Sequence, residues 1–164
     1  MVETFNETLL EANKKGLPVE YLDAEQDMLA AIDYAVKKYN KNIILWGSSY
    51  SSTLALHIAC ENKKVEAVIA FSPGNYFDEQ KGALKEKLMA LEIPMWVTSS
   101  KEEAPELTAL LDPASLKANQ LQFIPTTEGK HGSKALWKTH ENNEEYWEAI
   151  NNFLKAISPT LTNK

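Results

Sequence analysis

Short apolar runs alternate along the chain with segments whose apolar residues recur every three or four positions. The apolar runs predict strands at 42–46, 65–71, 94–99 and 121–124. The periodic segments predict helices at 4–15, 23–39, 51–62, 79–91, 105–111 and 143–157. Because short strands that alternate with helices are typical of βαβ units, we expect an α/β fold with a parallel β-sheet of about four strands and flanking helices.

The length and composition are those of one globular domain. The chain has 164 residues, 44% of them hydrophobic, which is ordinary for a chain that buries a core. We therefore expect a single domain over residues 1–164, with a polar segment at 1–20 in front of a core at 23–157. The run at 42–46 is almost continuously apolar, as is typical of a strand covered on both faces.

The net charge excludes several classes of partner, and the cysteine content excludes two kinds of site. The net charge of −6 provides no basic surface for phosphate backbones or anionic lipid, so we expect neither nucleic acid nor a membrane as a partner. The single cysteine, Cys60, excludes an internal disulfide and a Cys-rich metal site. No residues have metal-ligand spacing, so we expect no metal and no cofactor.

The sequence also bears on localisation. No run approaches the roughly eighteen apolar residues that a membrane-spanning helix needs. The N-terminus, residues 1–7, lacks the basic start and the apolar stretch of a secretion signal. We expect a cytoplasmic protein, and a signal sequence removed from the chain is the alternative.

The main local motif is Gly47-Ser48-Ser49-Tyr50-Ser51, between the first predicted strand and the helix after it. A serine at the apex of such a strand–turn–helix has a strained backbone and an exposed hydroxyl. The spacing Gly47-x-Ser49-x-Ser51 resembles the G-x-S-x-G nucleophile elbow of the α/β-hydrolases, with serine in place of the last glycine. Small residues are required there because the strand and the helix nearly touch. The structural alternative is a serine that caps the helix.

Segments after two later strands contain the other groups that a serine nucleophile needs. Ser99-Ser100-Lys101-Glu102-Glu103 follows the third predicted strand, and residues 126–132, which include His131, follow the fourth. Ligands of open parallel sheets bind beyond the carboxyl ends of the strands, so we expect these segments to meet. The chain order of serine, carboxylate and histidine is that of the α/β-hydrolases.

The three side-chain types have distinct roles in this chemistry. A serine hydroxyl is a weak nucleophile near neutral pH, so it needs an imidazole base whose tautomer a carboxylate fixes. We predict Ser49 as the nucleophile and His131 as the base. The α/β-hydrolase pattern of a strand that leads through a small-residue turn to an acid implies Glu103, and Glu102, one residue away, is the alternative acid.

Three further residues are predicted at the site. The backbone N–H of Tyr50, which follows the nucleophile, is the predicted oxyanion donor. Trp46 and Tyr76 are candidate substrate contacts, because both lie near the predicted crevice. Packing within the loops is the alternative role for each of these two side chains.

The resemblance covers residues 23–157 and corresponds to the C-terminal half of an α/β-hydrolase. Nothing in residues 1–22 matches the front strands of that fold or its usual second oxyanion donor. The strand at 42–46 would then be a sheet edge with unpaired backbone groups. Three explanations are open: the chain is a fragment of a longer protein, residues 1–20 cover the edge, or two copies pair there as a homodimer.

The resemblance implies a serine hydrolase that cleaves a carboxylic ester through an acyl-enzyme with a Ser-Glu-His triad. Its substrate would be a small-molecule ester, with thioesters, amides and peptides as alternatives. A function of another class is a non-catalytic α/β domain that binds a partner through the crevice or the open sheet edge. Covalent labelling of Ser49 discriminates between these two functions.

Overall fold

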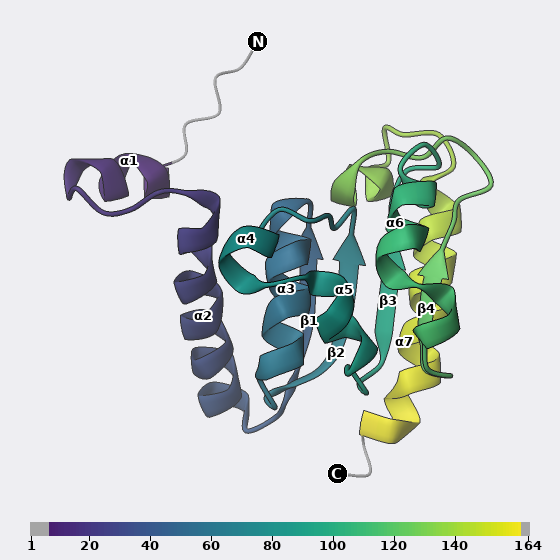
Figure 1. Cartoon of the computed structure of the whole chain (residues 1–164), viewed down its shortest axis with the longest axis horizontal. Helices are drawn as coiled ribbons and strands as arrows, with labels where there is room; N and C mark the ends of the chain where they lie inside the picture. Colours follow the sequence, from purple (N-terminus) through teal and green to yellow (C-terminus); the bar gives the residue numbers. More distant parts are fainter. Residues whose placement is uncertain (1–6, 162–164) are drawn as a thin grey trace.

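The computed structural model describes residues 7–161 and contains a sheet of four parallel strands in the order β1-β2-β3-β4 (Figure 1). The strands are β1 (Ile43–Ser48), β2 (Val65–Phe71), β3 (Met95–Thr98) and β4 (Gln120–Phe123). All four lie where the apolar runs predict them. The α/β fold with a parallel sheet and flanking helices is confirmed.

Helices cover both faces of this sheet (Figure 1). The α-helices are α1 (Glu7–Lys14), α2 (Ala24–Tyr39), α3 (Tyr50–Glu61), α4 (Asp78–Lys81), α5 (Leu84–Met89), α6 (Ala104–Leu111) and α7 (Asn143–Leu161). Three short 3-10 helices are η1 (Tyr21–Asp23), η2 (Pro113–Ser115) and η3 (Gly132–Leu136). Side chains of α2, α3, α5 and α6 form one core with the sheet, and side chains of α7 and η3 form the other.

Strand β2 shows why two cores form. Val68 and Ala70 point to the α3 side, whereas Ile69 and Phe71 point to the α7 side, as alternate residues of a strand do. All four are fully buried. A nearly continuous apolar run is therefore what this central strand requires.

Strand β1 is the edge of the sheet, and the expectation that it is covered on both faces is wrong at Trp46, although Ile44 on the same face packs against the α7-side core. Trp46 keeps 41% of its surface exposed, because α7 packs over β2 and β3 on this face, where Phe71 and Trp96 are buried. No strand within residues 7–161 pairs with the outer edge of β1.

The prediction of one continuous helix at 79–91 is also wrong in part, because the structure has two helices there, α4 and α5. Gly82 has φ +80°, a conformation that ends a helix and that favours glycine. The side chain of Asp78 then accepts the backbone N–H of Leu84 at 3.3 Å, at the start of α5. Leu84 and Leu88 still face the core. The apolar pattern therefore predicts the buried side chains correctly, but it does not predict the break in the backbone.

The N-terminal segment lies away from the sheet edge. The predicted helix at 4–15 begins outside the described residues, and its described part, α1, projects from the N-terminal end of α2 away from the sheet (Figure 1). Residues 7–20 therefore do not cover β1. Tyr21 of η1 stacks on Tyr50, with 4.3 Å between the ring centroids.

Within residues 7–161, no helix has the length and apolar character to span a membrane.

Candidate active site

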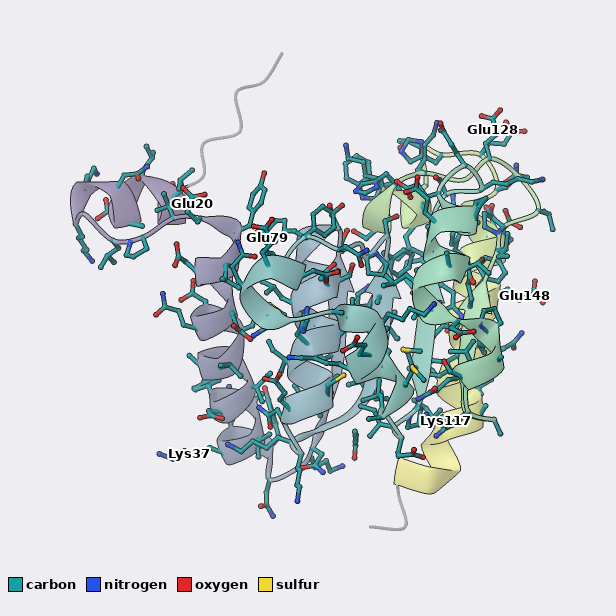
Figure 2. The ribbon with its side chains drawn as sticks, viewed as in Figure 1. Glu20, Lys37, Glu79, Lys117, Glu128 and Glu148 are labelled. Atoms are coloured by element: carbon teal, nitrogen blue, oxygen red, sulfur yellow. The ribbon has the colours of Figure 1, made fainter. Side chains whose placement is uncertain are left out.

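The predicted site residues lie at the end of the molecule where the parallel strands end. Figure 2 labels Glu128, which follows β4, at this end, and Lys117, which precedes β4, at the opposite end. The turns after β1, β2 and β3 and the segment after β4 all emerge on the side of Glu128. This is the edge at which open parallel sheets bind their ligands.

Ser49 occupies the turn between β1 and α3 in a strained backbone conformation. Its φ is +57° and its ψ is −134°, a region that costs a non-glycine residue about 1–3 kcal/mol. Its N–H donates to the carbonyl of Phe71 at 2.8 Å, so the turn is fastened to the end of β2. The strained serine at the apex of a strand–turn–helix is the geometry that the sequence predicts.

The residues on either side of Ser49 explain the spacing of the motif. A β-carbon on Gly47 would lie 2.5 Å from Cα of Ser52 and 2.5 Å from the carbonyl oxygen of Ser51, so only glycine fits there. The hydroxyl of Ser51 donates to the carbonyl of Ser48 at 2.7 Å and accepts the N–H of Ser48 at 3.0 Å. The serine that replaces the last glycine of the pattern therefore closes the turn with two hydrogen bonds.

The structure brings Ser49, His131 and Glu103 together. Oγ of Ser49 lies 2.9 Å from Nε2 of His131, and Nδ1 of the same ring is hydrogen-bonded to Oε1 of Glu103. Because an ionised carboxylate can only accept, Nδ1 carries the proton in this pair. Nε2 is then the acceptor for the hydroxyl proton of Ser49.

Glu103 is held as a carboxylate by its neighbours. Its Oε2 accepts the hydroxyl of Ser72 at 2.8 Å and the N–H of Ser100 at 3.1 Å. Burial acts to raise the pKa of Glu103, but the hydrogen bonds from His131, Ser72 and Ser100 outweigh it and hold this pKa below its ordinary value. Glu102 is exposed, and Glu103 is the member of this pair that touches His131.

The segment that carries His131 is anchored at several points. The side chain of Glu145 on α7 accepts the N–H and the hydroxyl of Thr126 and the hydroxyl of Thr127, at 2.7–2.9 Å. Beyond the histidine, the N–H of Gly132 donates to Oγ of Ser72 at 2.9 Å. The segment then enters η3, which the sequence does not predict.

Sequence reasoning did not identify Ser48 and Glu145 as parts of this site, and it predicted Ser72 only as part of a loop, residues 72–77, that lines a substrate pocket. Ser48 accepts the N–H of Ser133 at 2.9 Å, so it too anchors the segment after His131. A signal for Ser48 and Ser72 exists, because each lies at the carboxyl end of a strand, the position inspected for the three predicted residues. Glu145 has no such signal, since it comes from the first turn of α7.

The predicted oxyanion donor lies at the start of α3. The first N–H groups of a helix have no acceptor within the helix, and no acceptor for the N–H of Tyr50 exists among the described residues. This N–H follows Ser49 directly in the chain. Residues 7–22 contain no strand, so the usual source of a second donor is missing from this part of the chain.

The two candidate substrate contacts lie in different places. Tyr76 lines a cavity of about 160 Å³ that also borders His131 and Glu103. Trp46 stacks on Phe71, with 5.7 Å between the ring centroids, on the α7 face of the sheet, and it does not line this cavity. Among residues 7–161, no three His, Cys, Asp or Glu side chains are grouped so that they could hold a metal ion.

Comparison with known proteins identifies the fold. No protein-family model and no curated protein matches this chain. The Pyrococcus furiosus esterase Pf2001 has a similar structure, with a TM-score of 0.64 and 16% identity over 85% of this chain. A Klebsiella pneumoniae protein named as a dienelactone hydrolase has a TM-score of 0.62 and 12% identity over 84% of this chain. The chain has the α/β-hydrolase fold.

The α/β-hydrolase fold is only partly represented in this chain. The matched region spans 61–64% of the length of the Pyrococcus furiosus esterase in three crystal forms and 62% of the Klebsiella pneumoniae protein. The four described strands and their helices thus correspond to part of an α/β-hydrolase, as the sequence resemblance implies.

Proposed function

We propose that this chain is a serine hydrolase that cleaves a small carboxylic ester through an acyl-enzyme. One observation carries the proposal: Oγ of Ser49 lies 2.9 Å from Nε2 of His131 while Glu103 is bonded to the other ring nitrogen. Nucleophile, base and orienting acid are thus within hydrogen-bond reach of one another, as the chemistry requires. The strained turn at Ser49 supports the same role.

Acylation begins with attack on the ester carbonyl. Oγ of Ser49 forms a bond to the carbonyl carbon while Nε2 of His131 takes the hydroxyl proton, and Glu103 stabilises the resulting imidazolium. The N–H of Tyr50 donates to the oxyanion that develops on the carbonyl oxygen. The bond from the carbon to the alcohol oxygen then breaks, and His131 transfers its proton to the leaving alcohol.

Deacylation uses water in the place of the serine hydroxyl. Nε2 of His131 takes a proton from a water molecule whose oxygen attacks the acyl carbon. The bond between this carbon and Oγ of Ser49 breaks, and the proton on His131 returns to Oγ. One water is consumed, and one carboxylic acid and one alcohol are released, so the enzyme returns to its starting state.

The smaller of two cavities at His131 guides the proposed size of the substrate. This cavity, which Tyr76 also lines, has a volume of about 160 Å³, below the roughly 300–1,000 Å³ that is usual for sites of drug-sized ligands. The other cavity, which Glu128 also lines, has a volume of about 540 Å³. His131 itself is about half exposed, so the site is open to solvent. A short acyl or alcohol group fits the smaller cavity.

Reaction with a fluorophosphonate tests the proposal, because this probe modifies only an activated serine. We expect wild-type protein and the Ser115→Ala variant to be labelled and to hydrolyse p-nitrophenyl acetate, since Ser115 lies in η2, away from the triad. Ser49→Ala is expected neither to be labelled nor to hydrolyse the ester. Labelling of Ser49→Ala, or no reaction of folded wild-type protein, contradicts the proposal.

A binding module is the second candidate function, and the open edge of β1 is the observation that favours it. A strand edge with unpaired backbone groups accepts another strand, and a homodimer would pair β1 with its copy. Folded protein that does not react with the probe, and that has a dimer mass by light scattering, would support this function over hydrolysis.

A further inference from the structure

Ser72 is a buried serine directly after β2. It is 4% exposed, its φ is +50°, and its N–H donates to the carbonyl of Thr98 at 2.7 Å. The residue is thereby fixed between the ends of β2 and β3. A conformation of this kind in a non-glycine residue is uncommon and is found at functional sites.

The hydroxyl of Ser72 joins two parts of the candidate site. It donates to Oε2 of Glu103 at 2.8 Å and accepts the N–H of Gly132 at 2.9 Å. Both bonds coexist because a hydroxyl has one proton to donate and two lone pairs to accept. Glu103 is the carboxylate that binds Nδ1 of His131, and Gly132 is the residue after His131.

We propose that Ser72 is a positioning residue, which sets the distance between the carboxylate of Glu103 and the ring of His131. The inference rests on the proposed hydrolase function and extends it to the alignment of the acid with the base. Ser72 also lines the cavity beside His131, but its hydroxyl is bonded to Glu103 and Gly132, so its effect on the triad is transmitted through Glu103 and the His131 backbone.

Removal of the hydroxyl leaves two groups short of a partner. The buried N–H of Gly132 loses its acceptor, and Oε2 of Glu103 keeps only the N–H of Ser100. The rotation of the carboxylate about its last side-chain bond is then fixed only by its bonds to His131 and Ser100, and the segment after His131 loses one of its anchors. Both changes move the ring of His131 relative to Ser49.

Ser48 provides a matched control. Its hydroxyl accepts the N–H of Ser133 at 2.9 Å, the residue after Gly132, so it anchors the same segment. Among the described residues, its hydroxyl has no hydrogen bond to Glu103. Ser48→Ala therefore removes one anchor of the histidine segment, as Ser72→Ala does, but leaves the carboxylate with all its partners.

The first measurement requires no catalysis. We expect Ser72→Ala to raise the pKa of Glu103, because the hydrogen bond from Ser72 is one of those that lower it. The change is measured by carboxyl-carbon NMR during a pH titration of the free protein, with Ser48→Ala expected to match wild type. An unchanged Glu103 pKa in folded Ser72→Ala overturns the proposal, whether or not the protein is a hydrolase.

The second measurement is the turnover of p-nitrophenyl acetate. We expect Ser72→Ala to lower kcat by roughly 10- to 100-fold with little change in KM, which is the size of effect produced by a slight misplacement of reacting groups. Ser72→Gly removes the hydroxyl without strain at φ +50°, so it tests the same point if the alanine variant folds poorly. Ser72→Thr keeps a hydroxyl and is expected to recover part of the loss.

The outcomes separate this inference from the proposed function. If wild-type protein hydrolyses the ester but folded Ser72→Gly keeps the wild-type kcat, the hydrolase function stands and the role of Ser72 is wrong. If Ser72→Ala and Ser48→Ala lower kcat equally, Ser72 acts only as a backbone anchor and the inference is also overturned. If wild type does not react at all, the proposed function fails, and the Glu103 titration alone decides whether Ser72 governs this carboxylate.

Discussion

A β-carbon on Gly129 would lie 2.0 Å from the hydroxyl oxygen of Tyr146. Tyr146 is buried in α7 and its hydroxyl donates to the carbonyl of Ser99 at 3.2 Å, so any movement away from an added β-carbon breaks this hydrogen bond. Gly129 also has φ +64°, in the left-handed region that favours glycine. The segment that leads to His131 therefore touches α7 at a point where only glycine fits.

We expect Gly129→Ala to destabilise the protein more than Gly82→Ala does. Gly82 has φ +80° and ψ 165°, but nothing lies within 4 Å of its added β-carbon, so that substitution costs only backbone strain of about 1–3 kcal/mol. At Gly129 the steric clash with Tyr146 is added to the backbone strain of its own positive φ. Urea unfolding of both variants measures their free energies of unfolding. Equal losses of this free energy would show that Tyr146 moves to make room for the added β-carbon.

A second prediction separates the two adjacent glutamates. We expect Glu103→Gln to lower kcat/KM for p-nitrophenyl acetate by roughly 10³- to 10⁴-fold, the size of effect seen when the orienting acid of a triad becomes an amide. An amide can donate to Nδ1 of His131 and thereby favour the tautomer that cannot accept from Ser49. Glu102→Gln is expected to stay within a few-fold of wild type, because Glu102 is exposed. The reverse result would assign the acid role to Glu102.

A third prediction concerns His57, which is fully buried in α3. Neither of its ring nitrogens has a hydrogen-bond partner among the described residues. Burial lowers the pKa of His57, and the charges of Lys87 and Lys81 lower it further, against the smaller opposite effects of Glu61 and Glu25. The folded protein therefore takes up a proton at His57 at a lower pH than the unfolded chain, whose histidine titrates near 6.5.

It follows that His57 reduces stability in acid. Below a pH of about 6.5 the unfolded chain binds more protons than the folded protein, so the free energy of unfolding falls as the pH falls from 7 to 5. His57→Leu removes this proton uptake and is expected to show a smaller fall over the same range. Urea unfolding at pH 7, 6 and 5 gives both curves, and parallel curves would contradict the prediction.

The parts of the site that the sequence predicts are those fixed by local chemistry. Gly47 and Ser49 belong to one short turn, whose close packing admits only small residues and whose backbone strain marks the apex. The strands are predictable because their apolar runs are bounded by turn residues. The order of the strand ends along the chain then indicates which segments meet, and Ser49, Glu103 and His131 do meet.

The parts that the sequence misses depend on contacts between distant segments. The sequence places Ser72 in a predicted pocket loop but does not predict its hydrogen bonds, because its partners Glu103 and Gly132 are 31 and 60 residues away. The exposure of Trp46 likewise depends on where α7 packs, which the apolar run of β1 does not encode. The break between α4 and α5 had a local signal in Gly82, but the apolar spacing of Leu84 and Leu88 continues through it.

The open edge of β1 has a consequence for the chemistry, since this strand ends directly before Ser49. A guest strand that joins β1 in the parallel direction ends on the same side of the sheet, and its following loop then arrives beside the nucleophile. Occupation of this edge by a partner would then be coupled to turnover at Ser49.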